Sequence, residues 1–330
     1  MTVSQRIDQP TRAAGPVSSH TEWDPLEEVV VGRAADASLD AAHDLDDLAR
    51  RLEAEGVRVR RPDAVDPTRA YATADWQARG VSASAPRDAV VVIGSELIET
   101  PLPWRGRYFD TDAYRTLFLE YFRAGACWTA APRPDLKDAL YEAPSGEWLG
   151  SAPAFVVNET EPVLAASDVV RCGRDVFALR SPVSNRAGIE WLRRHLGDAL
   201  RVHEIETSRP IDARLDEILL PLAPGKLLVR ADVIDGSRLP APLRSWHRLS
   251  APAPEAGAAT RRAAALAHGV LGLDDRRVLV EASRSSLIEA LRGWGFEAIP
   301  ARLRTEASVG GSLRRATLDV RRSGELASYF

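Results

Sequence analysis

Short apolar runs recur along the chain, and most are followed by a segment in which apolar residues have helical spacing. In the first cycle, residues 28–32 (Glu-Val-Val-Val-Gly) contain a short apolar run, which predicts a buried strand. The next apolar positions lie three or four residues apart and predict a helix that ends at Gly56: Leu39, Ala42, Leu45, Leu48 and Leu52. Residues 57–61 then alternate apolar and basic side chains, which predicts a second strand.

Four further cycles follow, and three of them repeat this order of strand, helix and strand. Their predicted strands are 88–94 and 127–130, then 169–170, 176–179 and 200–205, then 218–222 and 226–230, then 278–281 and 296–299. Helical spacing connects the strands around Tyr114–Phe122, Ile189–Leu196 and Leu287–Trp294. Recurrence at roughly 60-residue intervals favours a repeat architecture closed on itself. An open α/β sheet would show the same alternation.

Three segments lack a clear pattern. Residues 62–84 and 251–264 are rich in Pro, Ala and Gly or weakly patterned, so we expect loops, the second in the manner of a lid. Residues 1–15 are expected to form a disordered tail, and residues 16–330 a single domain.

Composition narrows the class of protein. The 330 residues are 45% hydrophobic and 27% charged with a net charge of −4, which is ordinary for a globular protein and gives no basic surface for nucleic acid. No apolar run has the length of a membrane span, and the N-terminus lacks the apolar segment of a signal peptide. Two cysteines, Cys127 and Cys172, provide neither a disulfide framework nor metal-ligand spacing. We therefore expect a cytoplasmic protein with no nucleic-acid or membrane partner, no metal and no cofactor.

A series of collinear motifs carries a family resemblance. The longest is Pro-Val-Ser-Ser-His-Thr-Glu-Trp-Asp-Pro-Leu-Glu-Glu-Val-Val-Val-Gly-Arg at 16–33. Others occupy residues 85–88, 99–107, 113–115, 125–129, 173–175, 188–196 and 318–322. Together they resemble the glycine and inosamine-phosphate amidinotransferases, which move an amidino group from arginine to an amine. The resemblance extends from about residue 16 to the end of the chain.

This resemblance implies an architecture and a setting. Amidinotransferases are α/β proteins, pentein-like propellers of five ββαβ modules around a central channel that holds the active site. The five cycles of the sequence fit that plan. The family also implies a small-molecule ligand or biosynthetic intermediate in specialised metabolism, such as an antibiotic pathway, and a possible homodimer or complex with a paralogue.

The resemblance also locates three catalytic roles, and this chain departs from all of them. Amidino transfer uses a thiolate nucleophile, a general base and a carboxylate that orients the base. The family's His-Cys pair corresponds to Arg314 and Arg315, because the spacing to the 318–322 motif has no gap. Pro210 stands at the position of the base and Ala165 at that of the orienting Asp. A guanidinium is not a nucleophile at neutral pH, so the expected chemistry is missing.

Three carboxylates of the family pattern remain. Asp168 follows Ala165, and the resemblance matches Asp88 and Asp212 to residues that hold the substrate guanidinium. Loop carboxylates that cap backbone N–H groups are an equal alternative. A sharper hypothesis is that Arg315 pairs with Asp88 and Asp212 and blocks arginine as a built-in substrate mimic. The alternative for Arg315 is an exposed loop arginine.

Three functions remain open at this stage. The first is a repurposed enzyme that keeps the channel and uses Asp88, Asp168, Asp212 and the two arginines for positioning or acid–base work, including group transfer or cyclisation. The second is a non-catalytic protein that binds a ligand or a partner. The third is a true amidinotransferase with an unrecognised nucleophile, which would have to be Cys127 or Cys172. We expect both cysteines to be small buried hydrophobic residues instead.

Overall fold

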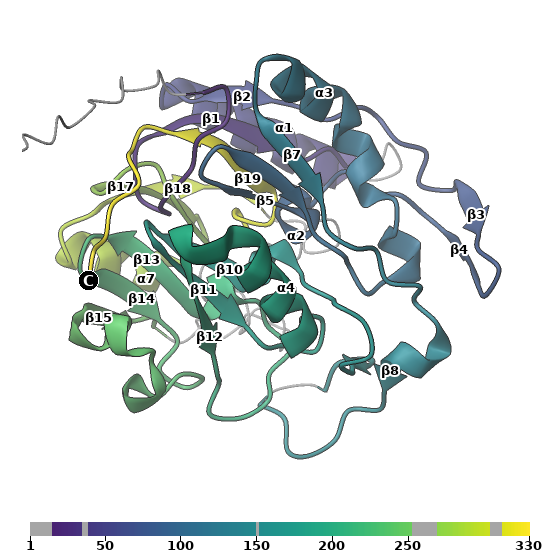
Figure 1. Ribbon diagram of the computed structural model, residues 1–330. Helices are drawn as coiled ribbons and strands as arrows, with labels where there is room; N and C mark the ends of the chain where they lie inside the picture. Colours follow the sequence, from purple (N-terminus) through teal and green to yellow (C-terminus); the bar gives the residue numbers. More distant parts are fainter. Residues whose placement is uncertain (1–14, 35–38, 150–151, 253–268, 304–311) are drawn as a thin grey trace, which may run out of the picture.

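The computed structural model describes residues 15–34, 39–149, 152–252, 269–303 and 312–330. Within these residues the chain forms five separate three-stranded sheets connected by helices, so the α/β prediction is confirmed (Figure 1). Neighbouring strands within each sheet are named in the order in which they pair. The first two sheets consist of β19 (Thr317–Arg322), β1 (Leu26–Val31) and β2 (Arg58–Arg60), and of β5 (Val90–Ile93), β6 (Glu96–Glu99) and β7 (Cys127–Ala130). The other three consist of β10 (Val169–Cys172), β11 (Asp175–Leu179) and β12 (Arg201–Ile205); of β13 (Leu219–Ala223), β14 (Lys226–Val229) and β15 (His247–Ser250); and of β16 (Val270–Gly272), β17 (Arg277–Glu281) and β18 (Glu297–Ala301).

All five sheets share one topology. The middle strand pairs antiparallel with one neighbour and parallel with the other. Four sheets use consecutive strands, whereas the first combines β1 and β2 with β19 from the other end of the chain. Residues at the two ends of the sequence, such as Val29 and Asp319, are therefore direct partners. No single closed sheet joins the five units within the described residues.

A helix connects the parallel pair in four of the sheets, which is the usual form of a parallel crossover, whereas 3₁₀ turns lie between β14 and β15. These helices are α1 (Leu39–Ala54), α3 (Arg115–Arg123), α4 (Arg186–Leu196) and α7 (Ser285–Gly293). Asn185 begins α4 by accepting a hydrogen bond of 2.8 Å from the Gly188 N–H. Gly188 itself lies so close to the Val163 carbonyl that a Cβ atom would be 2.1 Å from its oxygen, so only glycine fits there.

Apolar side chains of the sheets and helices form the core. Strands β5, β10, β11 and β13 are buried along their whole length. The inner faces of the four helices pack on the sheets, for example where Leu45, Leu48 and Leu52 of α1 share an apolar cluster with Val29 and Val31 of β1. Continuous apolar runs therefore predicted these four buried strands, whereas β6, the middle strand of its sheet, was not predicted.

The remaining elements are short. Within the described part of the chain, two further helices, α2 (Pro86–Ala89) and α5 (Leu215–Ile218), each make one turn before a strand. Two small hairpins consist of β3 (Ala70–Ala72) with β4 (Gln77–Arg79), which projects from the body in Figure 1, and β8 (Tyr141–Glu142) with β9 (Val156–Val157). The 3₁₀ turns are η1 (Arg105–Arg107), η2 (Asp110–Tyr114), η3 (Asp138–Leu140), η4 (Ala166–Asp168), η5 (Gly197–Ala199), η6 (Gly236–Arg238) and η7 (Ala241–Ser245).

Several expectations need correction. Residues 62–84 contain the β3–β4 hairpin and are not simply a loop, since backbone pairing there occurs without an apolar pattern. The strand predicted at 88–94 begins only at Val90, because residues 86–89 form α2 around Pro86 at the start of its turn. The disordered tail and the lid-like loop fall almost entirely on residues 1–14 and 253–268, which lie outside the described residues.

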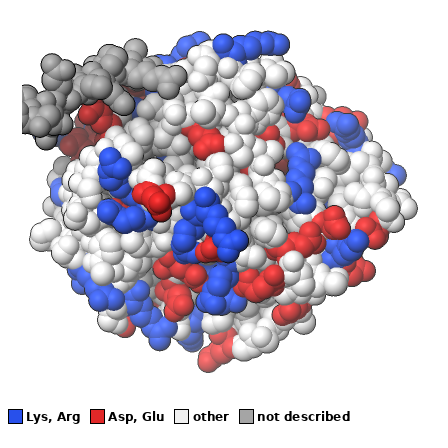
Figure 2. All heavy atoms as spheres, in the orientation of Figure 1, with Lys and Arg blue, Asp and Glu red and all other residues white. Residues whose placement is uncertain are grey.

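Two general properties follow for the described part of the chain. None of its helices combines the length and apolarity needed to cross a bilayer. Figure 2 shows acidic and basic side chains interspersed over one face of the molecule, without a large area of a single sign.

Candidate functional site

Short segments at equivalent places in the sheets gather the charged residues of the site. Helix α2 precedes β5, η4 precedes β10, α5 precedes β13, and a turn at 312–316 precedes β19. Helix α2 contacts η4 and β19, and η4 also contacts α5. The repeated topology therefore brings residues from four distant parts of the sequence together near the first strands of their sheets (Figure 1).

Arg315 and Asp88 form a bidentate ion pair at this meeting point. Arg315 Nε lies 3.1 Å from Asp88 Oδ1, and Nη2 lies 2.7 Å from Oδ2. Asp88 also accepts hydrogen bonds from Arg107 Nη1 at 2.7 Å and from the Ser167 hydroxyl at 2.9 Å. Burial opposes ionisation of Asp88, but the positive charges of Arg315 and Arg107 outweigh it and hold the pKa of Asp88 well below its usual range. Asp88 is therefore a permanently charged and fully engaged carboxylate.

Arg314, the neighbour of Arg315, points into a different set of contacts. It belongs to what we call the buried charge cluster, whose members are all at most 1% exposed: Glu22, Arg87, Arg171, Asp216, Arg314, Asp319 and Arg322. Arg314 Nη2 donates to Glu22, and its Nε lies 3.4 Å from Asp216 Oδ2. The two consecutive arginines thus pair with different carboxylates, Arg315 with Asp88, and Arg314 with Glu22 and Asp216.

Glu22 is the centre of the buried charge cluster. Arg171 donates to Glu22 from its backbone N–H and its Nε at 3.0 Å each, and Arg87 Nη2 donates at 3.1 Å. Burial opposes the charge on Glu22, yet Arg171, Arg314 and Arg87 lower its pKa well below the usual value. Burial likewise opposes the charge on Asp319, and the positive charges of Arg322 and Arg171 lower the pKa of Asp319 despite it. Such pairs hold their partners together strongly, since removing one partner leaves a buried charge.

Two other buried carboxyl groups near these pairs, Glu217 and Asp168, have pKa values above their usual range. Burial raises the pKa of Glu217 to about 7, although Arg315 acts against this shift. Burial likewise raises the pKa of Asp168 to about 6, opposed by Arg214 and by hydrogen bonds from Ser181 and Ser184. Both groups therefore exchange protons near neutral pH, which is a common property of groups at functional sites.

The structure separates Asp212 from the other predicted site residues. The Asp212 side chain is 46% exposed, and its nearest cation is Arg214, whose Nη1 lies 4.0 Å from Oδ1. The predicted pairing of Arg315 is thus present with Asp88 and absent with Asp212. The neighbours Ile211 and Ala213 are buried, and Asp212 lies in a bend between them with its side chain outward.

Ala165 and Pro210, the two other positions that the family resemblance singles out, both lie within the described residues. Ala165 is fully buried, and its backbone N–H donates to the Ser184 hydroxyl at 2.9 Å. Pro210 is exposed, and its carbonyl accepts from the Leu149 N–H at 2.9 Å. Neither side chain has an atom that can accept or donate a proton.

The two cysteines lie outside the contacts of Asp88. Cys172 is buried, as predicted, and burial raises the pKa of its thiol well above the usual value. The expectation that Cys127 is buried is wrong, because Cys127 is exposed at the start of the edge strand β7. A thiol is most nucleophilic as an accessible thiolate, and Cys172 is neither accessible nor easily ionised.

The structure adds site residues that sequence reasoning did not single out. These are Glu22, Arg87, Arg107, Arg171, Arg214, Asp216, Glu217 and Asp319. A weak signal existed for some of them, since Arg87 adjoins Asp88 and Glu22 lies in the opening motif. Their burial depends on tertiary contacts that no local pattern reveals.

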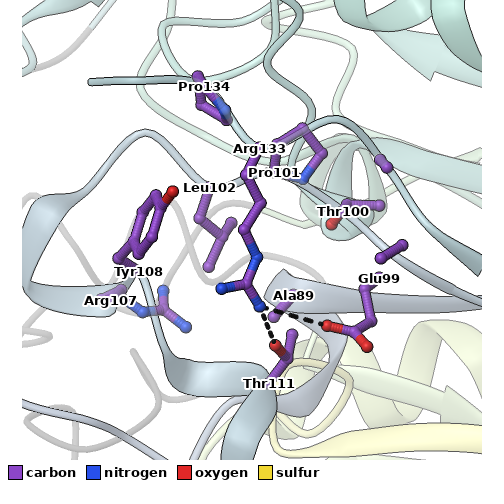
Figure 3. A pocket seen from close by; sticks show the side chains of 12 residues that line it. Ala89, Glu99, Thr100, Pro101, Leu102, Arg107, Tyr108, Thr111, Arg133 and Pro134 are labelled. Atoms are coloured by element: carbon purple, nitrogen blue, oxygen red, sulfur yellow. Dashed lines mark hydrogen bonds and ion pairs between the residues drawn. The ribbon is translucent and has the colours of Figure 1, made fainter. Parts of the chain in front are cut away.

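Two openings on the surface lead toward Arg107. One is a hollow of about 470 Å³ with the aromatic side chains of Trp104, Tyr141 and Phe155 in its wall. The other is shown in Figure 3, where Arg133 extends toward Thr111 and Glu99 and Arg107 lies beside Tyr108. Arg107 lines both openings and binds Asp88, so it connects the surface with the ion pair. Within the described residues, no group of three acidic, His or Cys side chains is arranged to hold a metal ion.

Comparison with known proteins identifies the family. The chain is 37% identical to the L-arginine:L-lysine amidinotransferase of Pseudomonas savastanoi pv. phaseolicola, over 95% of this chain and 96% of that protein. Among solved structures, it is similar to SxtG, an amidinotransferase of the saxitoxin biosynthetic pathway from Microseira wollei, with 42% identity, a TM-score of 0.85 and coverage of 96% and 100% of the two chains. The inosamine-phosphate amidinotransferase StrB1 from Streptomyces griseus has 31% identity, a TM-score of 0.86 and coverage of 96% and 99%. No protein-family model matches the sequence. At these identities over nearly the whole length, the chain belongs to the amidinotransferase family.

Proposed function

We propose that this protein does not transfer an amidino group from arginine, and that it acts on a different small biosynthetic intermediate. The observation that carries the proposal is the bidentate pair between Arg315 and Asp88. Arg315 occupies the sequence position at which the family resemblance implies the nucleophilic cysteine. The same side chain donates two hydrogen bonds to Asp88, the carboxylate that the resemblance matches to a residue holding the substrate guanidinium.

Free arginine would have to compete with Arg315 for Asp88, and this supports the proposed loss of arginine binding. A free arginine could reach Asp88 only by displacing a guanidinium of the same chemistry that the chain already holds in place. A tethered group has a high effective concentration, typically in the millimolar range or above, so a dilute ligand competes poorly with it. Arg107 and Ser167 occupy the remaining acceptor positions of Asp88.

Acid–base chemistry is the most direct alternative use of the site. Glu217 and Asp168, with pKa values raised to about 7 and about 6, can each take up or release a proton near neutral pH. Glu217 is close enough to Arg315 for the two charges to influence each other. A relative in a toxin pathway, SxtG, favours a role in specialised metabolism for this chain as well.

We also infer the domain architecture of the chain from the repeated topology of its sheets. Five sheets of equal strand order support a five-module propeller that spans residues 16–330 as one domain. A cytoplasmic location and a homodimer or a complex with a catalytic paralogue are part of the same proposal.

A second candidate is a non-catalytic protein that binds a ligand or a partner. It is favoured by the extent to which paired charges fill the interior, since Glu22, Arg314 and Asp216 use one another as partners. The third alternative, a working amidinotransferase with another nucleophile, has less support because Cys172 is buried and Cys127 lies on an edge strand.

A turnover assay separates the first two candidates. The purified protein is incubated with the metabolites made by the enzymes of neighbouring genes, and consumption is followed by mass spectrometry. Loss of turnover in Asp88→Ala, with turnover retained in the exposed control Asp198→Ala, supports an enzyme. Ligand binding without turnover by the unaltered protein supports the binding role and contradicts catalysis.

A further inference from the structure

A third hollow adjoins the opening shown in Figure 3, since Glu99 and Arg133 line both. Its volume of about 360 Å³ lies within the range of roughly 300–1,000 Å³ that ligand pockets usually show. Two acidic and two basic side chains line it together with the Trp128 ring, namely Glu99, Asp112, Arg115 and Arg133. These charges balance, so the lining as a whole favours neither a simple anion nor a simple cation.

Arg133 and Glu99 are engaged with partners in the protein. Arg133 Nη2 donates to the Thr111 hydroxyl at 3.2 Å and lies 3.7 Å from Glu99 Oε2 (Figure 3). The other carboxylate oxygen of Glu99 accepts a hydrogen bond of 2.8 Å from Trp128 Nε1. Along this side of the hollow the two opposite charges therefore compensate each other.

Arg115 has no such partner, although it lines the same hollow. Its guanidinium carbon lies 5.4 Å from the centre of the Trp128 ring, which is a cation–π contact. Within the described residues its side chain makes neither a hydrogen bond nor an ion pair. The ring is itself held by its hydrogen bond to Glu99 and by an edge contact with Phe118, with centroids 5.6 Å apart. Arg115 thus offers unused donors from a position that the ring helps to fix.

Asp112 is the acidic counterpart of Arg115 in this hollow. Its side chain accepts no hydrogen bond from the part of the chain that the structure describes, and Arg69 Nη1 is 3.9 Å from Oδ2. That distance is too long for a hydrogen bond, and such an exposed pair contributes little. Asp112 and Arg115 lie three positions apart where η2 continues into α3, so their side chains are neighbours on one face. No ion pair joins them, since the Arg115 guanidinium lies over Trp128 instead.

We propose that this hollow binds a small zwitterion of the α-amino-acid type with an apolar side chain. Its carboxylate accepts hydrogen bonds from Arg115, its ammonium group donates to Asp112, and its side chain lies against Trp128. A ligand with only one charge would leave either Arg115 or Asp112 without a partner. Two adjacent groups of opposite charge, each with free hydrogen-bonding capacity, therefore select a ligand that carries both charges close together.

The inference goes beyond the proposed function, because the hollow is separate from the ion pair at Asp88. The Asp88 carboxylate is bound by Arg315, Arg107 and Ser167, and none of these three residues lines the hollow. Substitutions of Arg115 or Asp112 therefore leave the Arg315–Asp88 pair intact.

The test uses probes that share parts of one amino acid. L-Phenylalanine carries both charges and a ring, 3-phenylpropionate lacks the ammonium group, phenethylamine lacks the carboxylate, and glycine lacks the side chain. Isothermal titration with the full-length protein is expected to show saturable binding of L-phenylalanine. Each of the other three should bind at least about tenfold more weakly, since each lacks one charge-assisted hydrogen bond or the aromatic contact.

Matched variants locate the binding. Arg115→Met keeps the length of the side chain and removes its charge, and Asp112→Asn keeps the shape of the carboxylate. Each should weaken L-phenylalanine about tenfold or more, the usual effect of losing a charge-assisted hydrogen bond. Arg123→Met, which removes an exposed arginine in the last turn of the same helix, should change nothing. Thermal unfolding shows whether each variant is folded, and if one of the two fails to fold, the other decides.

The proposal is overturned if L-phenylalanine does not bind saturably, or if 3-phenylpropionate or phenethylamine binds as tightly. It is also overturned if folded Arg115→Met or folded Asp112→Asn binds L-phenylalanine like the unaltered protein, because the binding would then lie elsewhere. Failure of the proposed function has a separate sign, which is release of ornithine from arginine.

Discussion

Arg315 donates two parallel hydrogen bonds to Asp88, with Nε 3.1 Å from Oδ1 and Nη2 2.7 Å from Oδ2. The two residues are 227 positions apart in the chain. The turn before β19 and helix α2 before β5 bring them together, because equivalent segments of the repeated sheets meet. An arginine side chain of the protein thus occupies both oxygens of this carboxylate.

Removal of the Arg315 guanidinium should destabilise the protein and open a place for a free one. Arg315→Ala leaves Asp88 with Arg107 and Ser167, so we expect a loss of about 2–3 kcal/mol, less than for an isolated buried charge. Methylguanidinium at millimolar concentration should then restore part of the loss, which thermal unfolding with and without the ion would measure.

The control for this rescue is Arg321→Ala, which removes a partly exposed arginine paired with Glu27. It should cost at most about 1 kcal/mol, as surface pairs do, and methylguanidinium should not affect it. Equal effects of the ion on both variants would contradict a specific place at Asp88.

Glu22 should be among the most sensitive residues of the chain. Glu22→Gln removes the charge that faces Arg87, Arg171 and Arg314, and leaves their buried guanidinium groups undercompensated. We expect a loss of about 3–5 kcal/mol or failure to fold. Glu27→Gln, at a partly exposed position five residues away, should change the free energy of unfolding by less than about 1 kcal/mol. A comparable cost for both would show that the buried charge cluster does not stabilise the fold.

Glu217 predicts a dependence of stability on pH. Its pKa is about 7 in the folded protein and 4.5 as the unperturbed value, so the folded state binds this proton more tightly than the unfolded chain. Stability from Glu217 is therefore present below pH 4.5 and is lost as pH rises toward 7, by up to about 3 kcal/mol.

The Glu217→Gln variant tests that sign. It should be more stable relative to the unaltered protein at pH 8 than at pH 5, as measured by urea unfolding at both values. Glu53→Gln, on the exposed side of α1, should show no such difference. If Glu217→Gln is equally stable relative to the unaltered protein at the two pH values, Glu217 does not titrate as described.

The cysteines should differ sharply in reactivity. An alkylating reagent should modify Cys127 in the native protein and Cys172 only after unfolding, because Cys172 is buried and its thiol resists ionisation. Peptide mass spectrometry of native and urea-treated samples gives the pattern. Cys127→Ser should leave any turnover unchanged, and a loss of turnover in that variant would favour the unrecognised nucleophile.

The sequence predicted strands with an uninterrupted apolar run better than strands with polar or charged side chains. Val90–Ile93 is an uninterrupted apolar run because β5 is buried on both faces. Strand β15, with His247 and Arg248 exposed at an edge, has no such pattern and was missed, as was the β3–β4 hairpin. Edge strands form through backbone pairing, which leaves little trace in side-chain polarity.

At the candidate site, the sequence predicted the position of Arg315 and its pairing with Asp88, but not most of the other side-chain contacts. The gap-free spacing to Asp319 set the register of Arg315, and its pair with Asp88 was foreseen from chemistry. The exposure of Asp212 was not foreseen, because it depends on how the bend between Ile211 and Ala213 turns that side chain. Contacts such as that between Glu22 and Arg314, 292 residues apart, arise only when the chain ends share a sheet.

Transfer of the amidino group itself is the most direct test of the central claim. Arginine labelled with ¹³C at the guanidino carbon is incubated with the protein and with glycine or lysine as acceptors, and ornithine, labelled guanidino products and intact protein are analysed by mass spectrometry. Under the proposed function we expect no ornithine, no labelled product and no amidino adduct on the protein, since Arg315 pairs with Asp88 and stands where the family resemblance implies the nucleophile. Ornithine release with a labelled product, or a labelled adduct on Cys127 or Cys172, would contradict it.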